Sequence, residues 1–316
     1  MSKKILLSGV QPTGRPHIGN YFGAMKQFAD IQLLGKYDCH IMIADYHGLN
    51  FIQDAQKMRQ NIYDLTLDYL AIGLDPKKAV IFKQSDVSAH TELAWIFDTI
   101  TTMPYLERAH AYKDAEAKNK EISVGTFNYP MLMAADILLY DADVVPVGQD
   151  QKQHIEYARD TAQKFNNIFG ETFKLPEPLI LENVAVVPGV DGKKMSKSYN
   201  NTIPLFAGRD EIIKAVMSIV TDSGGDIPAN VYNIHKLVRN EADLKELYEK
   251  NKGKYKILKE ALIEDLDAFI KPLREKREEI AKNTELVAQV LADGARKANE
   301  IAQAKLLTVK KNIGVL

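Results

Sequence analysis

The chain has 316 residues, of which 46% are hydrophobic and 26% charged, a globular composition with room for one large and one small domain. No apolar run approaches the roughly 20 residues of a membrane-spanning helix. The net charge of −1 excludes general electrostatic binding of nucleic acid, so any RNA contact has to use local patches. Cys39 is the only cysteine, which excludes an intrachain disulfide and a cysteine-based zinc site. Because residues 1–4 lead directly into an apolar run, we expect no signal peptide and a cytoplasmic protein.

The first predicted unit is a strand, a loop and a helix in residues 5–27, which read ILLSGVQPTGRPHIGNYFGAMKQ. The apolar run at residues 5–7 predicts a strand buried on both faces of a parallel sheet, ending at residues 8–9. Residues 11–14 have the composition of a turn, and apolar side chains recur at helical spacing from about Gly19. Such a unit offers backbone N–H groups and the positive end of a helix dipole to an anion.

The loop of this unit also carries His17 and Asn20, whose side chains can donate hydrogen bonds to phosphate oxygens. Neither the dinucleotide-binding pattern GxGxxG nor the phosphate-binding pattern GxxxxGK[ST] is present. A histidine in a glycine-rich loop is more often an ordinary turn residue than a ligand. A second motif therefore has to support a nucleotide site.

Further predicted strands alternate with predicted helices, which favours an α/β fold with a doubly wound parallel sheet. These strands are residues 38–44, 79–82, 144–147 and 184–187. Polar clusters follow two of them, at residues 45–48 and 148–151. Open α/β sheets bind ligands at the carboxyl ends of their strands, so both clusters are candidate site segments. For His47, in the first cluster, a satisfied loop histidine is an equally good interpretation.

Residues 88–128 interrupt this alternation and predict an insertion in the nucleotide fold. They contain an amphipathic helix whose apolar side chains are Leu93, Trp95, Ile96, Phe97 and Ile100. Trp95 fits core or interface packing. The apolar excess of the helix predicts a two-fold symmetric dimer through this region. The charged stretch at residues 113–121 predicts a solvated loop, with a mobile phosphate-contacting loop as the alternative.

Residues 129–140, YPMLMAADILLY, predict a buried helix that begins at Tyr129-Pro130, with proline in the first turn. Asp136 lies in the middle of this helix, where an unpaired carboxylate costs on the order of several kcal/mol. Its hydrogen-bond donor comes either from a partner elsewhere in the core or from a bound ligand. We favour the ligand, because the next strand also leads to a candidate site.

A cationic loop follows the last predicted strand. Residues 188–198 read PGVDGKKMSKS, with three lysines within five residues, two serines and nearby glycines. Such a loop is suited to hold a polyphosphate leaving group. A lysine-rich loop is usually only solvated, but the order Lys-Met-Ser-Lys-Ser is much more specific.

From Arg209 onward the sequence predicts helices and no strands. Basic residues concentrate at positions 250–277, but interleaved glutamates make a solvated face as good an interpretation as an RNA contact. In the last helix one apolar stripe contains small residues, which predicts close packing, and we expect this helix to pack back on the first domain. The stripe consists of Val287, Val290, Leu291, Gly294, Ala298 and Ile301.

Together, these motifs resemble the class I aminoacyl-tRNA synthetases. PHIGN at residues 16–20 is similar to the His-Ile-Gly-His signature, with Asn in the last place, and KMSKS stands at residues 194–198. Between them MAADILLY and VPVGQDQKQHIE, and near the end LADGARKANEIAQ, resemble the bacterial tryptophanyl-tRNA synthetase family. The similarity runs through nearly the whole chain. It implies a Rossmann-type catalytic domain in residues 1–205, with the insertion, and a helical anticodon-recognition domain in residues 206–316.

The resemblance implies a reaction and a set of partners. L-Tryptophan is activated by ATP with Mg²⁺ and transferred to the 3′ end of tRNA(Trp), with release of AMP and pyrophosphate, by a cytoplasmic homodimer. No metal is held by protein ligands alone. The implied ATP-binding residues are Gln11, Pro12, Thr13, Gly19, Asn20, Gly148, Gln149, Asp150, Val186, Lys194, Met195, Ser196, Lys197 and Ser198. The implied tryptophan-binding residues are Leu7, His47, Tyr129, Met133, Asp136, Val145, Val147 and Gln151. Catalysis would fall to His17, Asn20, Lys194 and Lys197.

Within this set, the resemblance implies that Asp136 accepts the indole N–H and that Tyr129 and Gln151 hold the amino group. Two positions depart from the family pattern. Many relatives have threonine where His17 stands, which gives His17 a more direct phosphate role, and some place an aromatic residue at Leu7. Two alternatives stay open: a tyrosyl-tRNA synthetase, and a non-catalytic regulator that binds RNA or tryptophan. Intact PHIGN and KMSKS motifs argue against the regulator.

Overall fold

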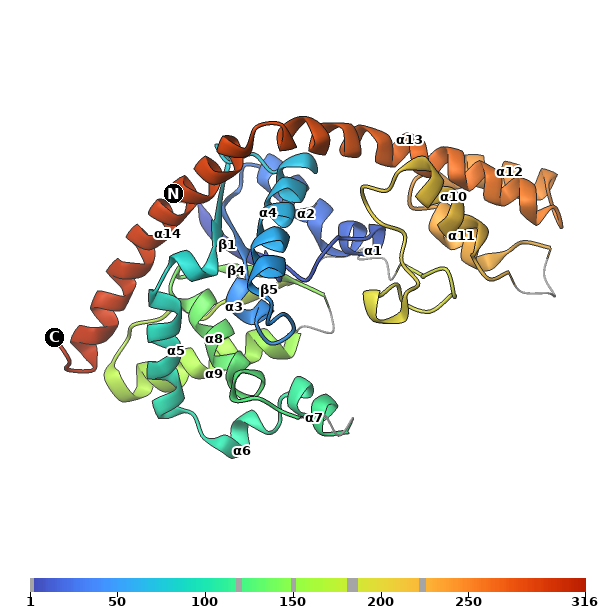
Figure 1. Ribbon diagram of the computed structural model, residues 1–316. Coiled ribbons are helices and arrows are strands. Elements are labelled where there is room, and N and C mark those ends of the chain that lie inside the picture. The colour runs from blue at the N-terminus through green and yellow to red at the C-terminus, as the bar shows by residue number, and fades with distance from the viewer. Residues whose placement is uncertain (1–2, 118–120, 149–151, 181–186, 222–225) are drawn as a thin grey trace.

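The computed structural model describes residues 3–117, 121–148, 152–180, 187–221 and 226–316 (Figure 1). In these residues five parallel strands form one sheet in the order β3-β2-β1-β4-β5. They are β1 (Lys4–Val10), β2 (Tyr37–Ile43), β3 (Ala79–Lys83), β4 (Val144–Val147) and β5 (Glu177–Ile180). This is the predicted doubly wound arrangement, and the direction of winding reverses between β1 and β4.

Strand β1 is longer than predicted. It pairs with β2 as far as Gly9 opposite Met42 and Val10 opposite Ile43, so the prediction that residues 8–9 end the strand is wrong. A Cβ atom on Gly9 would lie 2.6 Å from the carbonyl oxygen of Met42, so the two backbones approach each other in a way that only glycine allows.

The last strand also differs from expectation. The predicted strand at residues 184–187 falls outside the described residues except for Val187, which is buried but not in a strand. The fifth strand of the described sheet is β5 instead, which the sequence patterns did not reveal. It has only four residues and includes Pro178, two features that weaken a strand pattern.

Helices cover both faces of the sheet (Figure 1). Successive residues of β1 point to opposite faces. Leu6 belongs to a core shared with α2 (Lys26–Leu33) and α4 (Ala55–Ala71). Leu7 belongs to a second core shared with α5 (Ala89–Ile100), α8 (Val124–Leu138) and α9 (Lys152–Phe169). The shorter helices are α1 (Ile18–Asn20), α3 (Asp45–Gly48), α6 (Met103–Leu106) and α7 (His110–Ala117).

Helix α8 begins before the predicted position. The Ser123 hydroxyl accepts a hydrogen bond from the Thr126 backbone N–H at 3.2 Å and caps the helix, which then continues through Pro130. The prediction that Tyr129-Pro130 opens this helix is therefore wrong. Proline removes one backbone donor, but Pro130 and the side chains that follow it are buried, and this packing holds the segment in helical form.

The insertion distributes its apolar side chains differently from the prediction. Leu93 and Phe97 of α5 are fully buried within the chain, whereas Trp95 is 70% exposed and is not part of the core. In the predicted loop at residues 113–121, residues 113–117 form the end of α7, and residues 118–120 lie outside the described part.

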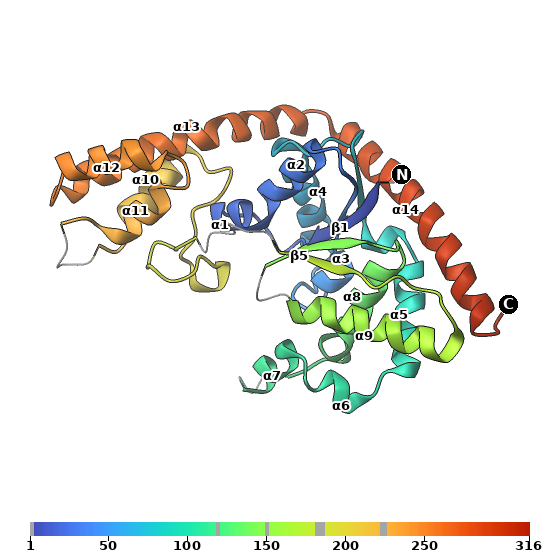
Figure 2. The same ribbon diagram turned by 180° about the vertical axis from the view of Figure 1, so that it is seen from behind.

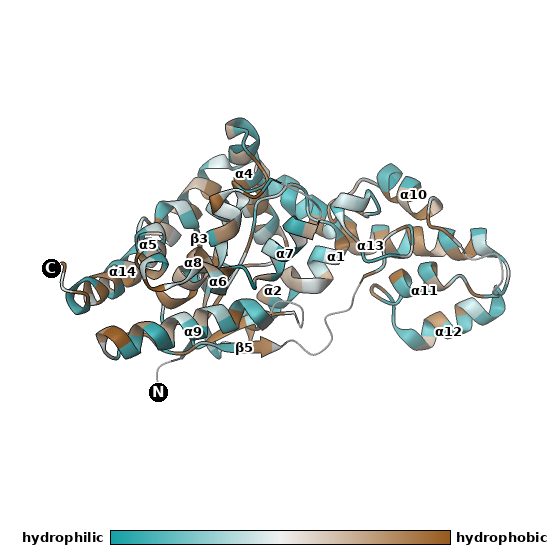
Figure 3. Ribbon diagram, turned by 90° about the horizontal axis from the view of Figure 1, so that it is seen from below, coloured by the Kyte–Doolittle hydropathy of each residue, from teal (hydrophilic) through white to brown (hydrophobic). Residues whose placement is uncertain are grey.

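The remaining helices form the C-terminal region: α10 (Arg209–Met217), α11 (Ala229–His235), α12 (Glu241–Lys250), α13 (Tyr255–Ala281) and α14 (Thr284–Asn312). Helices α10, α11 and α12 gather around one end of α13, away from α9 and β5 (Figure 3). Helix α14 returns to the first domain (Figure 2), where it packs against β3. A Cβ atom on Gly294 would lie 1.8 Å from the carbonyl oxygen of Ile81, so glycine permits this close contact. None of the described helices is both long and apolar enough to span a membrane.

Candidate active site

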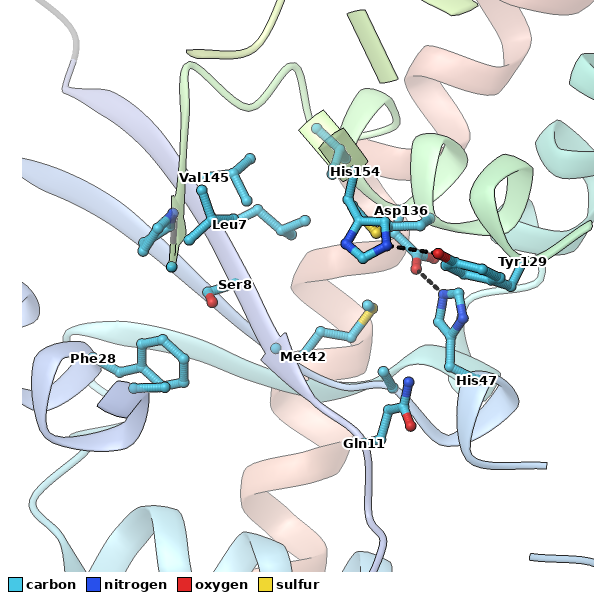
Figure 4. A pocket seen from close by; sticks show the side chains of 18 of the residues that line it. Leu7, Ser8, Gln11, Phe28, Met42, His47, Tyr129, Asp136, Val145 and His154 are labelled. Carbon is cyan, nitrogen blue, oxygen red and sulfur yellow. Dashed lines mark hydrogen bonds and ion pairs between the residues drawn. The ribbon is translucent and has the colours of Figure 1, made fainter. Parts of the chain in front are cut away.

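A cavity of about 370 Å³ opens where the direction of winding reverses, at the carboxyl ends of β1, β2 and β4 (Figure 4). Most of its walls are apolar. Leu7 and Met42 come from the strands, and Gly23 and Ala24 come from a π-helical turn, Tyr21–Met25, that follows the PHIGN signature. Such turns are frequent at functional sites because they displace the helix backbone. The same cavity is bordered by Asp136, at its polar end.

Asp136 is only 2% exposed and accepts hydrogen bonds from three side chains. His47 Nε2 donates to Oδ2 at 2.9 Å. Gln84 Nε2 and His90 Nδ1 both donate to Oδ1, at 2.8 Å and 2.6 Å. These residues come from α3, from a 3₁₀ turn after β3 and from α5, three segments far apart in sequence.

These contacts correct one prediction. The interpretation that Asp136 lacks a partner in the core, and that a ligand supplies its donor, is wrong in its first part. Burial alone would raise the pKa of Asp136, but its hydrogen bonds with His47 and His90 lower this pKa to about 2. The carboxylate is therefore ionised at neutral pH and already paired before any ligand arrives.

A second polar group faces the cavity beside His47, whose ring centroid lies 6.4 Å from that of Tyr129. The Tyr129 hydroxyl and His154 Nε2 lie 2.6 Å apart, and both residues line the cavity (Figure 4). Burial raises the pKa of Tyr129 to about 12, so its hydroxyl stays protonated at neutral pH. His154 was not selected from the sequence. Its position in the first turn of α9, directly after the candidate segment 148–151, was the available signal.

The PHIGN signature is held by a reciprocal pair of hydrogen bonds. The Asn20 backbone N–H donates to His17 Nδ1 at 3.2 Å, and the His17 backbone N–H donates to Asn20 Oδ1 at 3.1 Å. Burial and the nearby charge of Lys197 lower the pKa of His17 to about 4, so its ring is neutral at pH 7. Because Nδ1 accepts, the ring proton is on Nε2, which becomes a hydrogen-bond donor.

The two signature motifs pack together. The backbone N–H of Ile18 donates to the carbonyl of Ile203 at 2.9 Å, just beyond the KMSKS motif. Met195 is buried, and a Cβ atom on Gly19 would lie 3.3 Å from its Cβ. Lys197 Nζ donates to the carbonyls of Thr13 and Gly14 at 3.3 Å and 2.8 Å. The predicted phosphate residues of both motifs thus form one contiguous surface.

Asn201 shapes the KMSKS loop from beneath and was not identified from the sequence. It is 1% exposed, and its Oδ1 accepts from the Ser196 backbone N–H at 2.7 Å. Its Nδ2 donates to Asp191 Oδ1 at 2.7 Å and to the Lys194 carbonyl at 3.2 Å. The available signal was the asparagine pair Asn200-Asn201 shortly after the KMSKS motif, because an asparagine side chain can both donate to and accept from backbone groups of a loop.

The structure brings the predicted residues together in two groups. Those that line the cavity are Leu7, Gln11, His47, Tyr129, Met133, Asp136, Val145, Val147 and Gly148. Those in or beside the packed signature loops are Pro12, Thr13, His17, Gly19, Asn20, Lys194, Met195, Ser196, Lys197 and Ser198. Gln149, Asp150, Gln151 and Val186 lie outside the described residues. Gln84 and His90 are further members of the cavity region that the sequence did not suggest.

Comparison with known proteins now decides the family. Residues 2–291 match the family model of tRNA synthetases class I (W and Y). A curated tryptophan–tRNA ligase from Fusobacterium nucleatum is 49% identical, and the match covers 98% of each chain. The chain belongs to the tryptophanyl-tRNA synthetase family. The crystal structure of a tryptophanyl-tRNA synthetase from Campylobacter jejuni complexed with ADP and tryptophan has a TM-score of 0.90 and 45% identity, covering 98% of this chain and 99% of that one.

A third match agrees with this assignment. The tryptophanyl-tRNA synthetase from Mycoplasma pneumoniae has a TM-score of 0.85 at 31% identity, over 98% of each chain. The family, fold class and enzyme class predicted from the sequence are therefore confirmed, and neither the tyrosine alternative nor the regulator is favoured. The chain is an aminoacyl-tRNA ligase, a tryptophan–tRNA ligase.

Proposed function

We propose how this tryptophan–tRNA ligase divides its reaction between the cavity and the signature loops. The tryptophan side chain enters the cavity, and ATP lies across the loop after β1 and the KMSKS loop. The amino acid carboxylate attacks the α-phosphate, tryptophanyl-adenylate forms, and pyrophosphate leaves. The acyl group then passes to the 3′ end of tRNA(Trp), and AMP is released.

The observation that carries this proposal is the carboxylate of Asp136 at the wall of an otherwise apolar cavity. The indole N–H can only donate, so it needs a fixed acceptor. A carboxylate has about four lone-pair sites, and the three hydrogen bonds of Asp136 leave one for a ligand. Met133, Val145 and Val147 border the same space and suit a flat bicyclic ring.

The other end of the amino acid needs polar partners. We assign the amino group to the Tyr129 hydroxyl, together with Gln151 as the family resemblance implies. Tyr129 is supported by its place on the cavity wall beside His154, with its hydroxyl protonated. Gly148, at the carboxyl end of β4, leaves the backbone open to close approach by the ligand's polar end.

The phosphates are assigned to both signature loops. The neutral ring of His17 can donate from Nε2, and Asn20 is fixed beside it. Lys194 and Lys197 supply positive charge where negative charge accumulates on the departing pyrophosphate. Lys197 holds two loop carbonyls, so binding of ATP requires it to exchange these partners for phosphate oxygens. The Campylobacter jejuni relative that was solved with ADP and tryptophan supports both ligands.

Several further assignments belong to the proposal. Mg²⁺ enters with ATP on the phosphate oxygens. Among the described residues, no cluster of three histidine, cysteine or acidic side chains could hold a metal alone. Residues 206–316 recognise the tRNA anticodon, and residues 1–205 carry the chemistry. The enzyme works in the cytoplasm as a homodimer through residues 88–128, where exposed Trp95 is available and buried Leu93 is not. Sedimentation as a monomer at micromolar concentration would contradict the dimer.

The central experiment is amino-acid-dependent ATP–pyrophosphate exchange with all twenty amino acids, followed by aminoacylation of a tRNA(Trp) transcript. We expect exchange with tryptophan alone and stable charging of the transcript. A preference for tyrosine in exchange would overturn the substrate assignment. Exchange without charging would contradict the assignment of residues 206–316 to tRNA.

A further inference from the structure

The two oxygens of Asp136 are not equivalent. Oδ1 accepts from both Gln84 and His90, which uses both of its lone pairs. Oδ2 accepts from His47 alone among the described residues. The remaining acceptor position on this carboxylate is therefore on Oδ2, and the side chains around Oδ1 decide which oxygen faces the cavity.

His90 is the most tightly constrained of these donors. It is fully buried and does not line the cavity formed by the described residues. Its Nδ1 donates to the carboxylate, so its Nε2 accepts from the Tyr140 hydroxyl at 2.8 Å. Burial and the charge of Asp136 raise the pKa of Tyr140, so the hydroxyl keeps the proton that it donates. The ring also stacks on Phe82, with centroids 6.2 Å apart and planes inclined by 26°.

The orientation of the Gln84 side chain is also fixed by hydrogen bonds. Its Oε1 accepts from the backbone N–H groups of Tyr46 and His47 at 3.1 Å and 3.4 Å, which fixes the orientation of its amide. Its Nε2 is then directed to Asp136. Both donors to Oδ1 are thus oriented by hydrogen bonds to other groups of the protein.

We propose that His90, held by Tyr140, is a positioning residue that sets the selectivity for a ring N–H by keeping Oδ2 of Asp136 as the open acceptor. The proposal rests on the proposed function, in which Asp136 receives the indole N–H. Without the donor on Oδ1, the carboxylate can turn about its last torsion, and an unsatisfied oxygen enters the cavity. Water or another donor then competes with the indole N–H, so a substrate that lacks the N–H loses less of its relative affinity.

The experiment compares tryptophan with β-(3-benzothienyl)alanine, in which sulfur replaces the ring N–H at nearly the same shape. The ratio of their kcat/KM values in ATP–pyrophosphate exchange measures selectivity for the N–H. We expect His90→Leu to lower this ratio about tenfold. His90→Asn keeps an amide donor near the position of Nδ1 and should hold the ratio within about threefold of wild type.

The matched control is His235→Leu. His235 is also fully buried between a tyrosine hydroxyl and an aspartate, but in the helical C-terminal region. It measures the general cost of removing such a histidine. We expect His235→Leu to lower the melting temperature by an amount similar to His90→Leu while leaving the substrate ratio at the wild-type value.

The outcomes separate this proposal from the one on which it rests. A wild-type enzyme that does not prefer tryptophan over the sulfur analogue would contradict the role of Asp136 itself. A wild-type preference that His90→Leu preserves would overturn the positioning role alone. Loss of the ratio in His90→Asn as complete as in His90→Leu would also overturn the positioning role.

A second variant covers the case in which His90→Leu fails to fold. Tyr140→Phe keeps the ring but removes the hydroxyl that fixes His90. The ratio should fall about threefold, since His90 can then change its tautomer or turn. An unchanged ratio in a folded Tyr140→Phe enzyme would contradict the part of the proposal that assigns the orientation of His90 to Tyr140.

Discussion

Two buried chains of hydrogen bonds in this molecule consist of the same three residue types, tyrosine, histidine and aspartate, but they differ in the surroundings of the aspartate. In the cavity region, Tyr140 donates to His90, and His90 donates to Asp136. The carboxylate at the end of this chain is 2% exposed and borders the cavity. Its described partners are His47, Gln84 and His90, none of which carries a permanent charge. One acceptor position of the carboxylate stays open.

The second chain lies in the helical region. The Tyr248 hydroxyl pairs with His235 Nδ1 at 3.2 Å, and His235 Nε2 donates to Asp265 Oδ2 at 2.6 Å. Here Arg239 also donates to Asp265 Oδ2 at 3.1 Å, and the Asp265 side chain is 28% exposed. The permanent positive charge of Arg239 therefore pairs with the carboxylate at the end of this chain. In the function that we propose, the first chain serves substrate recognition because its carboxylate keeps an open acceptor position, whereas the second chain serves stability alone.

The first prediction concerns a variant that should slow catalysis but leave substrate recognition unchanged. Lys197→Ala should lower the single-turnover rate of adenylate formation by roughly 100-fold or more, because a cation at the departing pyrophosphate acts mainly in the transition state. The affinity for tryptophan, and its selectivity over phenylalanine, should change little. Rapid-quench kinetics check the rate, and a near wild-type rate would remove Lys197 from the mechanism.

The second prediction tests the comparison directly. Asp136→Ala should lower kcat/KM for tryptophan by roughly 10- to 100-fold and erode selectivity over phenylalanine, which has no ring donor. Asp265→Ala should leave both quantities unchanged. Pyrophosphate exchange with tryptophan, tyrosine and phenylalanine provides the measurement. An unchanged tryptophan-to-phenylalanine ratio in Asp136→Ala would exclude this carboxylate from substrate recognition.

The contrast between the two chains also shows what the sequence could and could not predict. Continuous apolar strands and helical spacing are local patterns, so the alternation of strands and helices and the site at the carboxyl edge followed from them. Asp136 stood out because a carboxylate interrupts an apolar helix. Its partners did not, because Gln84 and His90 reach it from other elements and nothing in their own neighbourhood indicates the contact.

The errors have similar physical causes. Gly9 and Pro130 are residues that usually end a strand or a helix, but tertiary packing overrides both tendencies here. Trp95 lies two residues after Leu93, off the stripe of positions 93, 96, 97 and 100, so it faces outward and is not a core residue, while its role in an interface stays a prediction. Asn201 was missed because it organises the KMSKS loop through hydrogen bonds to backbone groups of that loop, which its own sequence neighbours indicate only weakly.

A third prediction separates the chains by pH. Burial lowers the pKa of His235, so the unfolded chain binds more protons than the folded chain below about pH 6.5. The stability contributed by neutral His235 is present above this pH and is lost as the pH falls. For Asp136, with its pKa of about 2, the corresponding loss begins only below about pH 4 and continues toward pH 2.

The measurement is thermal unfolding of wild type and His235→Gln between pH 7.5 and 5. Glutamine can keep a donor to Asp265 but does not titrate. Other buried histidines, such as His17 and His40, contribute to both proteins alike. Between pH 7.5 and 5, wild type should lose a few degrees more in melting temperature than the variant. Parallel curves would show that His235 does not couple protonation to folding.

The smallest expected effect concerns Arg239, the arginine that pairs with Asp265. Arg239→Ala removes a partly exposed partner of Asp265 and should lower stability by about 0.5–1 kcal/mol, with no change in kcat/KM. Chemical denaturation gives the stability difference. A change in the tryptophan-to-phenylalanine ratio would mean that the helical chain communicates with the cavity, and the distinction between the two chains would fail.

The contact of Gly294 with the Ile81 carbonyl has a consequence for synthesis of the protein. Strand β3 is the edge of the sheet, and the helix that lies along it, α14, begins only at Thr284. Until α14 has left the ribosome, the sheet can assemble but its β3 edge is uncovered, a surface that invites pairing with other chains. Emergence of α14 therefore completes the first domain. Chains arrested before residue 283 should be bound by chaperones more strongly than chains that include this helix.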